Sequence, residues 1–269
     1  MTLLASLEGL LASLGRVVLG YSGGVDSAVL AVAGRRTLGA EGFLAVIGRS
    51  ASYPAAQYAN AVALAHRFDL PLLELDTAEL DDPDYRANTP DRCYFCKREL
   101  WNALGAVARE RGFTTVIDGT NADDLGEHRP GLRAAQELRI VSPLAELGWT
   151  KAMVREVARS LDLPTWDAPA SPCLSSRIQY GLEVTPERLA QVEAAEAWLR
   201  ALGVTGNLRV RHRDEHASIE IDAAMRPLVE GSWPVIEAQL RSLGFARVSL
   251  DAQGYRRGAL LPALPVLGG

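Results

Sequence analysis

The six residues from Ser22 to Ser27 combine the groups that a phosphate-binding turn needs. Their sequence is Ser-Gly-Gly-Val-Asp-Ser, and the glycines permit a tight turn whose backbone N–H groups point at an anion. Ser22 and Ser27 add hydroxyl groups, and the carboxylate of Asp26 suits a Mg²⁺ ion. The turn lacks the lysine of a Walker A loop. The pattern indicates a nucleotide phosphate bound by another kind of loop.

The flanking residues predict a strand before this turn and a helix after it. Residues 16–21 are mainly apolar, and residues 28–33 begin a helix that we expect to end at Gly34 or Gly39. A helix N-terminus supplies further N–H groups and the positive end of a dipole. A glycine turn without function would also fit here. Phosphate binding is favoured because the six residues together match the pattern of a phosphate-binding turn.

Three cysteines have the spacing of metal ligands. Cys93 and Cys96 form a C-x₂-C pair in a loop-like stretch just before a helix, and Cys173 lies far downstream. Such thiolates serve zinc and iron–sulfur centres, and three of them on a four-iron cluster would leave one iron open. Zinc would need a fourth ligand, for which His128 is the nearest candidate, whereas a redox dithiol would leave Cys173 without a role.

The elements that must position these groups alternate through the first half of the chain. We expect strands at residues 16–21, 42–48, 72–76 and 114–118, and further helices at residues 55–68, 97–111 and 150–161. This alternation predicts a parallel sheet with helices on both faces. Ligands bind such sheets at the carboxyl ends of the strands, where Ser22, Ser50 and Asn121 are expected.

The pattern changes after residue 177 and predicts a smaller α+β domain. Helices are expected at residues 185–202 and 233–243, and strands at residues 208–213, 217–222 and 246–250. We therefore expect a first domain at 1–180, a second at 181–257 for substrate binding or oligomerisation, and a tail at 258–269.

The composition of the chain argues against some classes of binding partner. Of the 269 residues, 48% are apolar and 23% charged, and the net charge of −5 provides no overall basic surface for nucleic acid. The N-terminus lacks the basic start of a signal peptide, and Glu8 interrupts its apolar run. We expect a cytoplasmic protein that binds neither nucleic acid nor membrane. An odd number of cysteines there argues against a disulfide framework.

Five segments together resemble the LarE family of sulfur transferases, a branch of the PP-loop ATP pyrophosphatases. They are residues 22–27, 118–124, 129–131, 142–144 and 172–177. The similarity extends over nearly the whole chain, and the last segment, Pro-Cys-Leu-Ser-Ser-Arg, is the most specific. The resemblance implies the adenine nucleotide α-hydrolase-like fold and an enzyme that cleaves ATP between its α and β phosphates.

The resemblance also implies a reaction. Pyridinium-3,5-biscarboxylic acid mononucleotide is adenylated with release of pyrophosphate, and sulfur then displaces AMP to give a thiocarboxylate for the nickel-pincer nucleotide. Ser22, Gly23, Gly24 and Ser27 would hold the pyrophosphate and Asp26 the Mg²⁺ ion. Gly119 and Asn121 would line the AMP pocket. Asp123 and Asp124 would assist Mg²⁺ or ribose, or would cap a helix.

The remaining assignments concern sulfur and the substrate phosphate. Family members with three cysteines are thought to hold a [4Fe–4S] cluster with an extra sulfide, which would make Cys93, Cys96 and Cys173 ligands. In members with one cysteine, the residue matching Cys173 gives up its own sulfur. Ser176, Arg177 and Arg211 are candidates for the substrate phosphate, because Arg209, Arg211 and Arg213 share one strand face. A homo-oligomer is expected.

Three rival functions fit parts of the pattern. A tRNA thiolase also joins a PP-loop to three cysteines, but it would need a basic RNA-binding face. An amide-forming ligase of the NAD or GMP synthetase type would not need the cysteines. A nucleotide-binding iron–sulfur sensor would bind ATP without releasing pyrophosphate.

Overall fold

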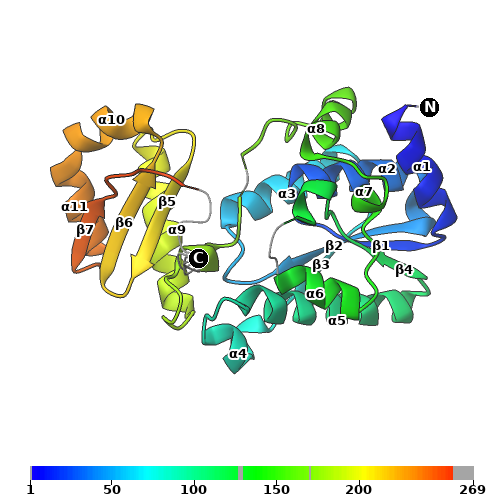
Figure 1. The fold of residues 1–269 in the computed structure, drawn as a ribbon, viewed down its shortest axis with the longest axis horizontal. Coiled ribbons are helices and arrows are strands. Elements are labelled where there is room, and N and C mark those ends of the chain that lie inside the picture. Colours follow the sequence, from blue (N-terminus) through cyan, green and yellow to red (C-terminus); the bar gives the residue numbers. More distant parts are fainter. Residues whose placement is uncertain (1, 127–129, 170, 257–269) are drawn as a thin grey trace, which may run out of the picture. The chain divides into compact units, whose positions relative to one another are not determined.

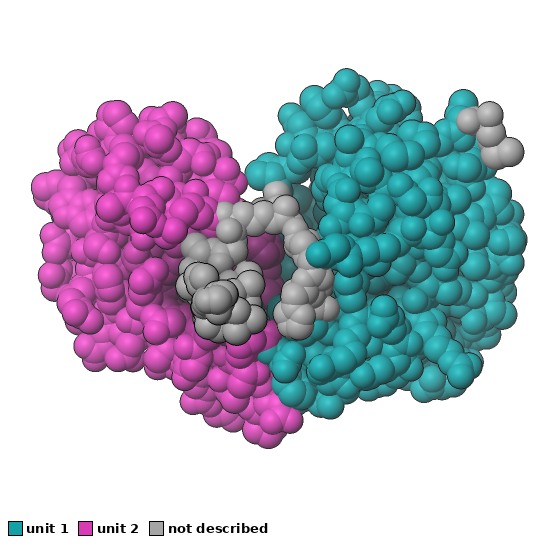
Figure 2. All heavy atoms as spheres, viewed as in Figure 1, with its two compact units in different colours: residues 1–82, 91–171 teal, residues 83–90, 172–269 magenta. Residues whose placement is uncertain are grey.

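The computed structural model describes residues 2–126, 130–169 and 171–256. They form two compact units, which Figure 2 distinguishes by colour. Unit 1 comprises residues 1–82 and 91–171, and unit 2 comprises residues 83–90 and 172–269. The division lies nine residues before the expected boundary, and it assigns residues 83–90 to unit 2. The expected tail at 258–269 lies outside the described residues, as does Arg257.

Unit 1 is built on a four-stranded parallel sheet with the strand order β3-β2-β1-β4 (Figure 1). The strands are β1 (Val17–Gly20), β2 (Phe43–Arg49), β3 (Leu72–Asp76) and β4 (Thr115–Ile117). The predicted parallel α/β fold is confirmed. Strand β1, which leads into the glycine turn, is central, with β2 and β4 as its neighbours.

Helices cover both faces of this sheet, since alternate strand residues point to opposite sides. Leu19 and Ala45 pack on one face against helices α1 (Leu3–Ser13), α2 (Val25–Gly42), α3 (Ala55–Arg67), α7 (Pro143–Glu146) and α8 (Lys151–Ser160). Val18 and Val46 pack on the other face against helices α5 (Arg92–Arg111) and α6 (Pro130–Glu137). Figure 1 shows these two layers of helices around the sheet.

One helix limit agrees with an expected position and another differs. Helix α2 passes Gly34 and is interrupted at Gly39, one of the two expected ends, where φ is 71°. Helix α5 begins at Arg92, five residues before the expected start, so Cys93 and Cys96 lie in its first two turns rather than in a loop. Contacts with α6 support this early start, because Tyr94 Oη donates to Glu137 Oε2 at 2.7 Å.

Unit 2 contains a three-stranded sheet and its own core. Strands β5 (Leu208–Arg213) and β6 (His216–Ile221) are antiparallel, whereas β7 (Arg247–Leu250) is parallel to β6. The core includes residues of helices α9 (Pro186–Ala201), α10 (Arg226–Gly231) and α11 (Trp233–Ser242). The short helix α4 (Pro83–Arg86) also belongs to this unit.

Residues 83–90 are anchored on residues 175–184 of the same unit. Tyr85 Oη and Ser175 Oγ share a buried hydrogen bond of 2.6 Å. The side-chain amide of Asn88, which is fully buried, donates to the carbonyls of Gln179 at 2.8 Å and Leu182 at 2.9 Å. These contacts join residues that are remote in the sequence, so the sequence pattern did not reveal that residues 83–90 belong to unit 2.

Over the stretches that the structure describes, we find no helix both long and apolar enough to cross a membrane.

Candidate functional site

The glycine turn at the end of β1 is shaped by close contact with α3. Gly23 has φ of 65°, and a Cβ atom there would lie 2.4 Å from Ala61 Cβ. Tyr21, buried just before the turn, donates its hydroxyl hydrogen bond to the Ala61 carbonyl at 3.0 Å. Gly24 is the N-cap of α2, whose first-turn N–H groups have no partners within the helix. The strand, the glycine turn and the helix thus follow one another as the sequence predicted.

The two serines of the turn differ in surroundings. Ser27 is buried, donates to the Gly24 carbonyl at 3.1 Å and accepts from the Ser22 N–H at 3.2 Å. Its hydroxyl thus closes the turn from inside. Ser22 is exposed, and its carbonyl accepts from Tyr53 Oη at 2.9 Å and Gln57 Nε2 at 3.1 Å. The Ser22 hydroxyl lies on the more exposed side of the turn, 3.2 Å from Ser27 Oγ.

The end of β4 meets the turn at the same edge of the sheet. Gly119 packs directly on it, since an added Cβ would lie 3.2 Å from both Asp26 Cβ and Ser27 N. Asn121 Nδ2 donates to Asp26 Oδ1 at 3.1 Å. The buried Asp118 fixes this segment by accepting from Ser142 Oγ at 2.7 Å. The structure therefore brings Gly119, Asn121 and Asp26 together.

Asp123 and Asp124 act on backbone groups. Asp124 Oδ2 accepts from the Asn121 N–H at 3.1 Å, and Asn121 Oδ1 accepts from the Asp123 N–H at 3.0 Å, which forms a capping box. Asp123 Oδ2 accepts from the Lys151 N–H at 2.9 Å. Of the two expected roles, these contacts match helix capping.

Lys151 was not predicted as a site residue. It is the first residue of α8, and its Nζ forms an ion pair with Asp26 Oδ2. The side chains are 38% and 20% exposed, so the pair can be reached from solvent. A signal existed in the sequence, because Lys97 and Lys151 are the only lysines in this arginine-rich chain.

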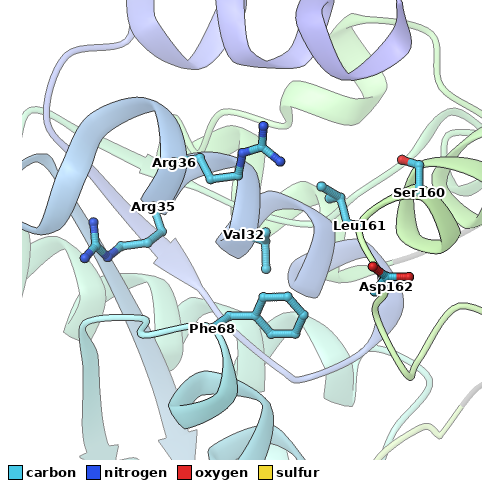
Figure 3. A pocket seen from close by; sticks show the side chains of 7 residues that line it. All are labelled: Val32, Arg35, Arg36, Phe68, Ser160, Leu161 and Asp162. Carbon is cyan, nitrogen blue, oxygen red and sulfur yellow. The ribbon is translucent and has the colours of Figure 1, made fainter.

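Unit 1 contains a pocket that lies away from the carboxyl edge of the sheet (Figure 3). It measures about 290 Å³, and its lining includes Arg35 and Arg36 from the far half of α2 and Asp162 after the end of α8. Arg35 pairs with Asp69 at 2.6 Å and Arg36 with Glu8 at 3.5 Å. Arg35 lies nine positions after Asp26 on α2, which corresponds to roughly 14 Å along the helix. This pocket is therefore too far from the glycine turn to be the proposed phosphate site.

The cysteines are divided between the two units. Cys93 and Cys96 lie three residues apart on α5, which places both thiols on one side of the helix. Cys93 is exposed, whereas Cys96 and Cys173 are half-buried. Cys173 directly precedes the short helix η3 (Leu174–Arg177) in unit 2. Among the described residues no three His, Cys, Asp or Glu side chains are grouped to hold a metal ion, and His128 lies outside those residues.

The predicted phosphate residues of unit 2 form one buried cluster. Arg177 donates to both oxygens of Glu196 at 2.9 Å and to the Cys173 carbonyl at 3.0 Å. Arg211 donates to Glu220 Oε2 at 2.9 Å and to the Ser176 carbonyl at 2.8 Å. The structure thus brings Ser176, Arg177 and Arg211 together.

A third arginine lies near this cluster. Arg209 is buried near Arg177 and Arg211, and burial followed by repulsion from Arg177 lowers its pKa. Glu196 and Glu220, the carboxylate partners of Arg177 and Arg211, were not predicted as site residues. Arginines gathered in this way suit an anionic ligand.

Comparisons with known proteins identify the family of this chain. The profile of the NAD synthase family matches residues 7–93, a stretch that includes the glycine turn. The chain is 34% identical to the pyridinium-3,5-bisthiocarboxylic acid mononucleotide synthase of Lactiplantibacillus plantarum, over 95% of this chain and 92% of that protein. The chain belongs to the LarE family of PP-loop sulfur transferases.

Two further relatives also match this chain over most of its length. An uncharacterized protein of Synechocystis, slr1717, is 39% identical over 96% of both chains. An uncharacterized protein of Methanocaldococcus jannaschii, MJ0830, is 30% identical over 90% of this chain and 91% of its own. The LarE family likeness therefore includes both units, whereas the NAD synthase match is confined to the first part of the chain. Of the motif at 129–131, Arg129 lies outside the described residues.

Proposed function

We propose that this protein adenylates a carboxylate of pyridinium-3,5-biscarboxylic acid mononucleotide with ATP and converts it to a thiocarboxylate, as a step towards the nickel-pincer nucleotide. One observation carries the proposal: Asp26 of the glycine turn lies between Lys151 and Asn121, at the edge where α/β sheets bind ligands. The LarE family membership selects the substrate.

In the first step a substrate carboxylate oxygen attacks the α phosphorus of ATP. The new O–P bond forms as the bond to the β-phosphate oxygen breaks, and pyrophosphate leaves. The N–H groups of Gly23, Gly24 and the first turn of α2, together with the Ser22 hydroxyl, stabilise its charge, while Ser27 keeps the turn closed. Gly119 and Asn121 border the AMP portion.

Asp26 is the proposed Mg²⁺ ligand. Its carboxylate is half-exposed and shared with a lysine and an amide, a donor set that Mg²⁺ can enter by displacing the Lys151 ammonium. Lys151 is then free to pair with a phosphate oxygen. The bound ion would neutralise charge on the departing pyrophosphate.

In the second step sulfur attacks the carbonyl carbon of the acyl adenylate. A C–S bond forms, the C–O bond to AMP breaks, and AMP leaves with the electron pair. The thiols of Cys93, Cys96 and Cys173 are the donors that an iron–sulfur cluster requires, and their exposure fits that use. These three residues would hold a [4Fe–4S] cluster, which when bound would supply an extra sulfide.

Ser176, Arg177 and Arg211 are the proposed phosphate ligands for the substrate. The proximity of three buried arginines, Arg177, Arg209 and Arg211, supports this assignment. Arg177 also donates hydrogen bonds to both the Cys173 carbonyl and Glu196. If Arg177 moved to bind phosphate, the position of the Cys173 backbone would change.

The direct test mixes the purified, cluster-reconstituted protein with Mg-ATP, sulfide source and the pyridinium dicarboxylate under anaerobic conditions. Equal amounts of AMP and pyrophosphate and a product heavier by the exchange of oxygen for sulfur are expected. Asp26→Asn should stop AMP formation and leave the fold intact, because the change removes the metal ligand and keeps the turn. An amide product with ammonia would indicate the ligase function, thiolated tRNA the tRNA thiolase, and binding without pyrophosphate the sensor.

A further inference from the structure

A small pocket opens at the carboxyl end of β2, beside the glycine turn. It measures about 200 Å³ and is lined by Arg49, Ser50, Tyr53, Ala55 and Tyr58. Its wall reaches the turn, because Tyr53 Oη donates to the Ser22 carbonyl at 2.9 Å. Pockets for whole drug-sized ligands hold about 300–1,000 Å³, so this one suits a single planar ring system.

A chain of hydrogen bonds behind the pocket fixes the direction of the Ser50 hydroxyl. Ser52 Oγ donates to Glu79 Oε1 at 3.1 Å, and both residues are buried. Ser50 Oγ lies 2.8 Å from Ser52 Oγ. A hydroxyl has one proton and two lone pairs. Because Ser52 has given its proton to Glu79, the proton between the two serines comes from Ser50.

Ser50 therefore faces the pocket as an acceptor only. One of its lone pairs accepts from the Ser52 N–H at 3.2 Å. The second lone pair remains for a ligand, whereas the proton is already committed. The same holds for the other hydroxyls of the pocket, since Tyr53 donates to Ser22 and Tyr58 donates to the Glu74 carboxylate.

The rest of the wall suits an uncharged aromatic ligand. The rings of Tyr53 and Tyr58 meet edge to face, with centroids 6.2 Å apart. The charge of Arg49 is compensated by Glu74 at 3.0 Å and Asp76 at 2.8 Å. A planar base that offers an N–H donor to Ser50 would find both an aromatic surface and an acceptor.

We propose that Ser50 selects the base of the nucleotide by accepting a hydrogen bond from the exocyclic amine of adenine. This inference rests on the proposed ATP-dependent function and names the residue that sets its nucleotide specificity. A purine with an oxygen at that position would direct a lone pair at the lone pair of Ser50. The Ser50–Ser52–Glu79 chain thus rejects the oxo base through the direction of one proton.

The test measures the Kd of ATP and of inosine triphosphate, which differ at this position, by calorimetry with Mg²⁺ on the full chain. We expect the wild type to bind ATP more tightly by roughly 5- to 150-fold, the range of one unsatisfied polar group. Ser50→Ala should weaken ATP towards the inosine value, and Ser50→Thr should keep the preference. Ser52→Ala frees the proton of Ser50, so inosine triphosphate should bind more tightly while ATP changes little.

Ser13→Ala is the matched control. The Ser13 hydroxyl donates to the Leu10 carbonyl on the exposed side of α1. Thermal unfolding of each variant verifies its fold. If ATP binds but every variant keeps the wild-type ratio of the two Kd values, the role of Ser50 is wrong and the ATP-dependent function stands. If the wild type binds no ATP, the nucleotide site itself is wrong, and this inference with it.

Discussion

Lys151 Nζ forms an ion pair with Asp26 Oδ2, although 125 positions separate the two residues in the chain. The pair joins the first turn of α8 to the first turn of α2 at the carboxyl edge of the sheet. Both side chains retain access to solvent, so the pair can open when ligands arrive. We therefore expect this pair to matter more for the proposed nucleotide site than for the stability of the fold.

Replacing Lys151 by methionine should separate these two effects. Exposed ion pairs contribute about 1 kcal/mol or less to the free energy of unfolding, so the fold should tolerate the change. AMP formation should fall by roughly 10- to 150-fold, the loss of one charge-assisted hydrogen bond to a phosphate. Pyrophosphate release and urea unfolding provide the two measurements.

Arg35→Met is the control for this variant, because it breaks another exposed pair, with Asp69, far along α2. It should leave AMP formation unchanged. Equal activity of the Lys151 and Arg35 variants would exclude a role for Lys151 at the phosphates.

Replacing Arg177 by alanine should destabilise unit 2 and weaken substrate binding more than ATP binding. Removing one partner of a buried ion pair costs roughly 3–5 kcal/mol, because Glu196 would be left without its cation. The double variant Arg177→Met/Glu196→Leu should recover much of that stability without recovering affinity for the phosphorylated substrate. Calorimetric Kd values for substrate and ATP check both effects.

Arg200→Ala is suited as a control, because Arg200 donates to the carbonyls of Val204 and Gly206 in the same unit. Recovery of substrate affinity together with stability in the double variant would show that Arg177 is a purely structural residue.

Replacing any one of Cys93, Cys96 or Cys173 by alanine should lower the iron bound after anaerobic reconstitution from about four per chain. Sulfur transfer should stop, while AMP formation should continue, since the glycine turn does not use these side chains. Iron and sulfide analysis, the absorbance spectrum and pyrophosphate release are the measurements. Dehydroalanine at Cys173 after one turnover, with Cys93 and Cys96 dispensable, would instead indicate that the cysteine itself is the sulfur donor.

Acid should destabilise unit 2 through His212. Burial lowers the pKa of His212 from 6.5 to about 4, and its Nε2 is 2.9 Å from Gln191 Oε1. The unfolded chain therefore binds the proton more readily than the folded chain between these values. The free energy of unfolding should decrease as pH falls from about 6.5 towards 4.

His212→Gln should reduce that pH dependence, as urea unfolding at pH 7 and pH 5 would show. An equal loss of stability on acidification in both proteins would assign the effect to other groups. His66→Gln is the control, because His66 lies on the exposed surface of α3.

The sequence predicted best where local pattern and chemistry coincide. Strand β3 has the expected limits, 72–76, and the glycine turn has the expected strand and helix on either side. The early start of α5 was missed because its support comes from α6, through Tyr94 and Glu137. Lys151 was missed for a similar reason, since its partner Asp26 is remote in sequence. Pairings of this kind depend on the topology of the sheet, which local patterns do not encode.

The anchoring of residues 83–90 has a consequence for how the protein is made and inherited. Asn88 meets its carbonyl partners 91 and 94 positions later, so during synthesis this stretch leaves the ribosome long before the rest of its unit. Unit 2 can therefore complete its folding only after all of unit 1 has been translated. A gene segment that begins at residue 172 would lack this stretch, so recombination cannot move unit 2 as a single contiguous module.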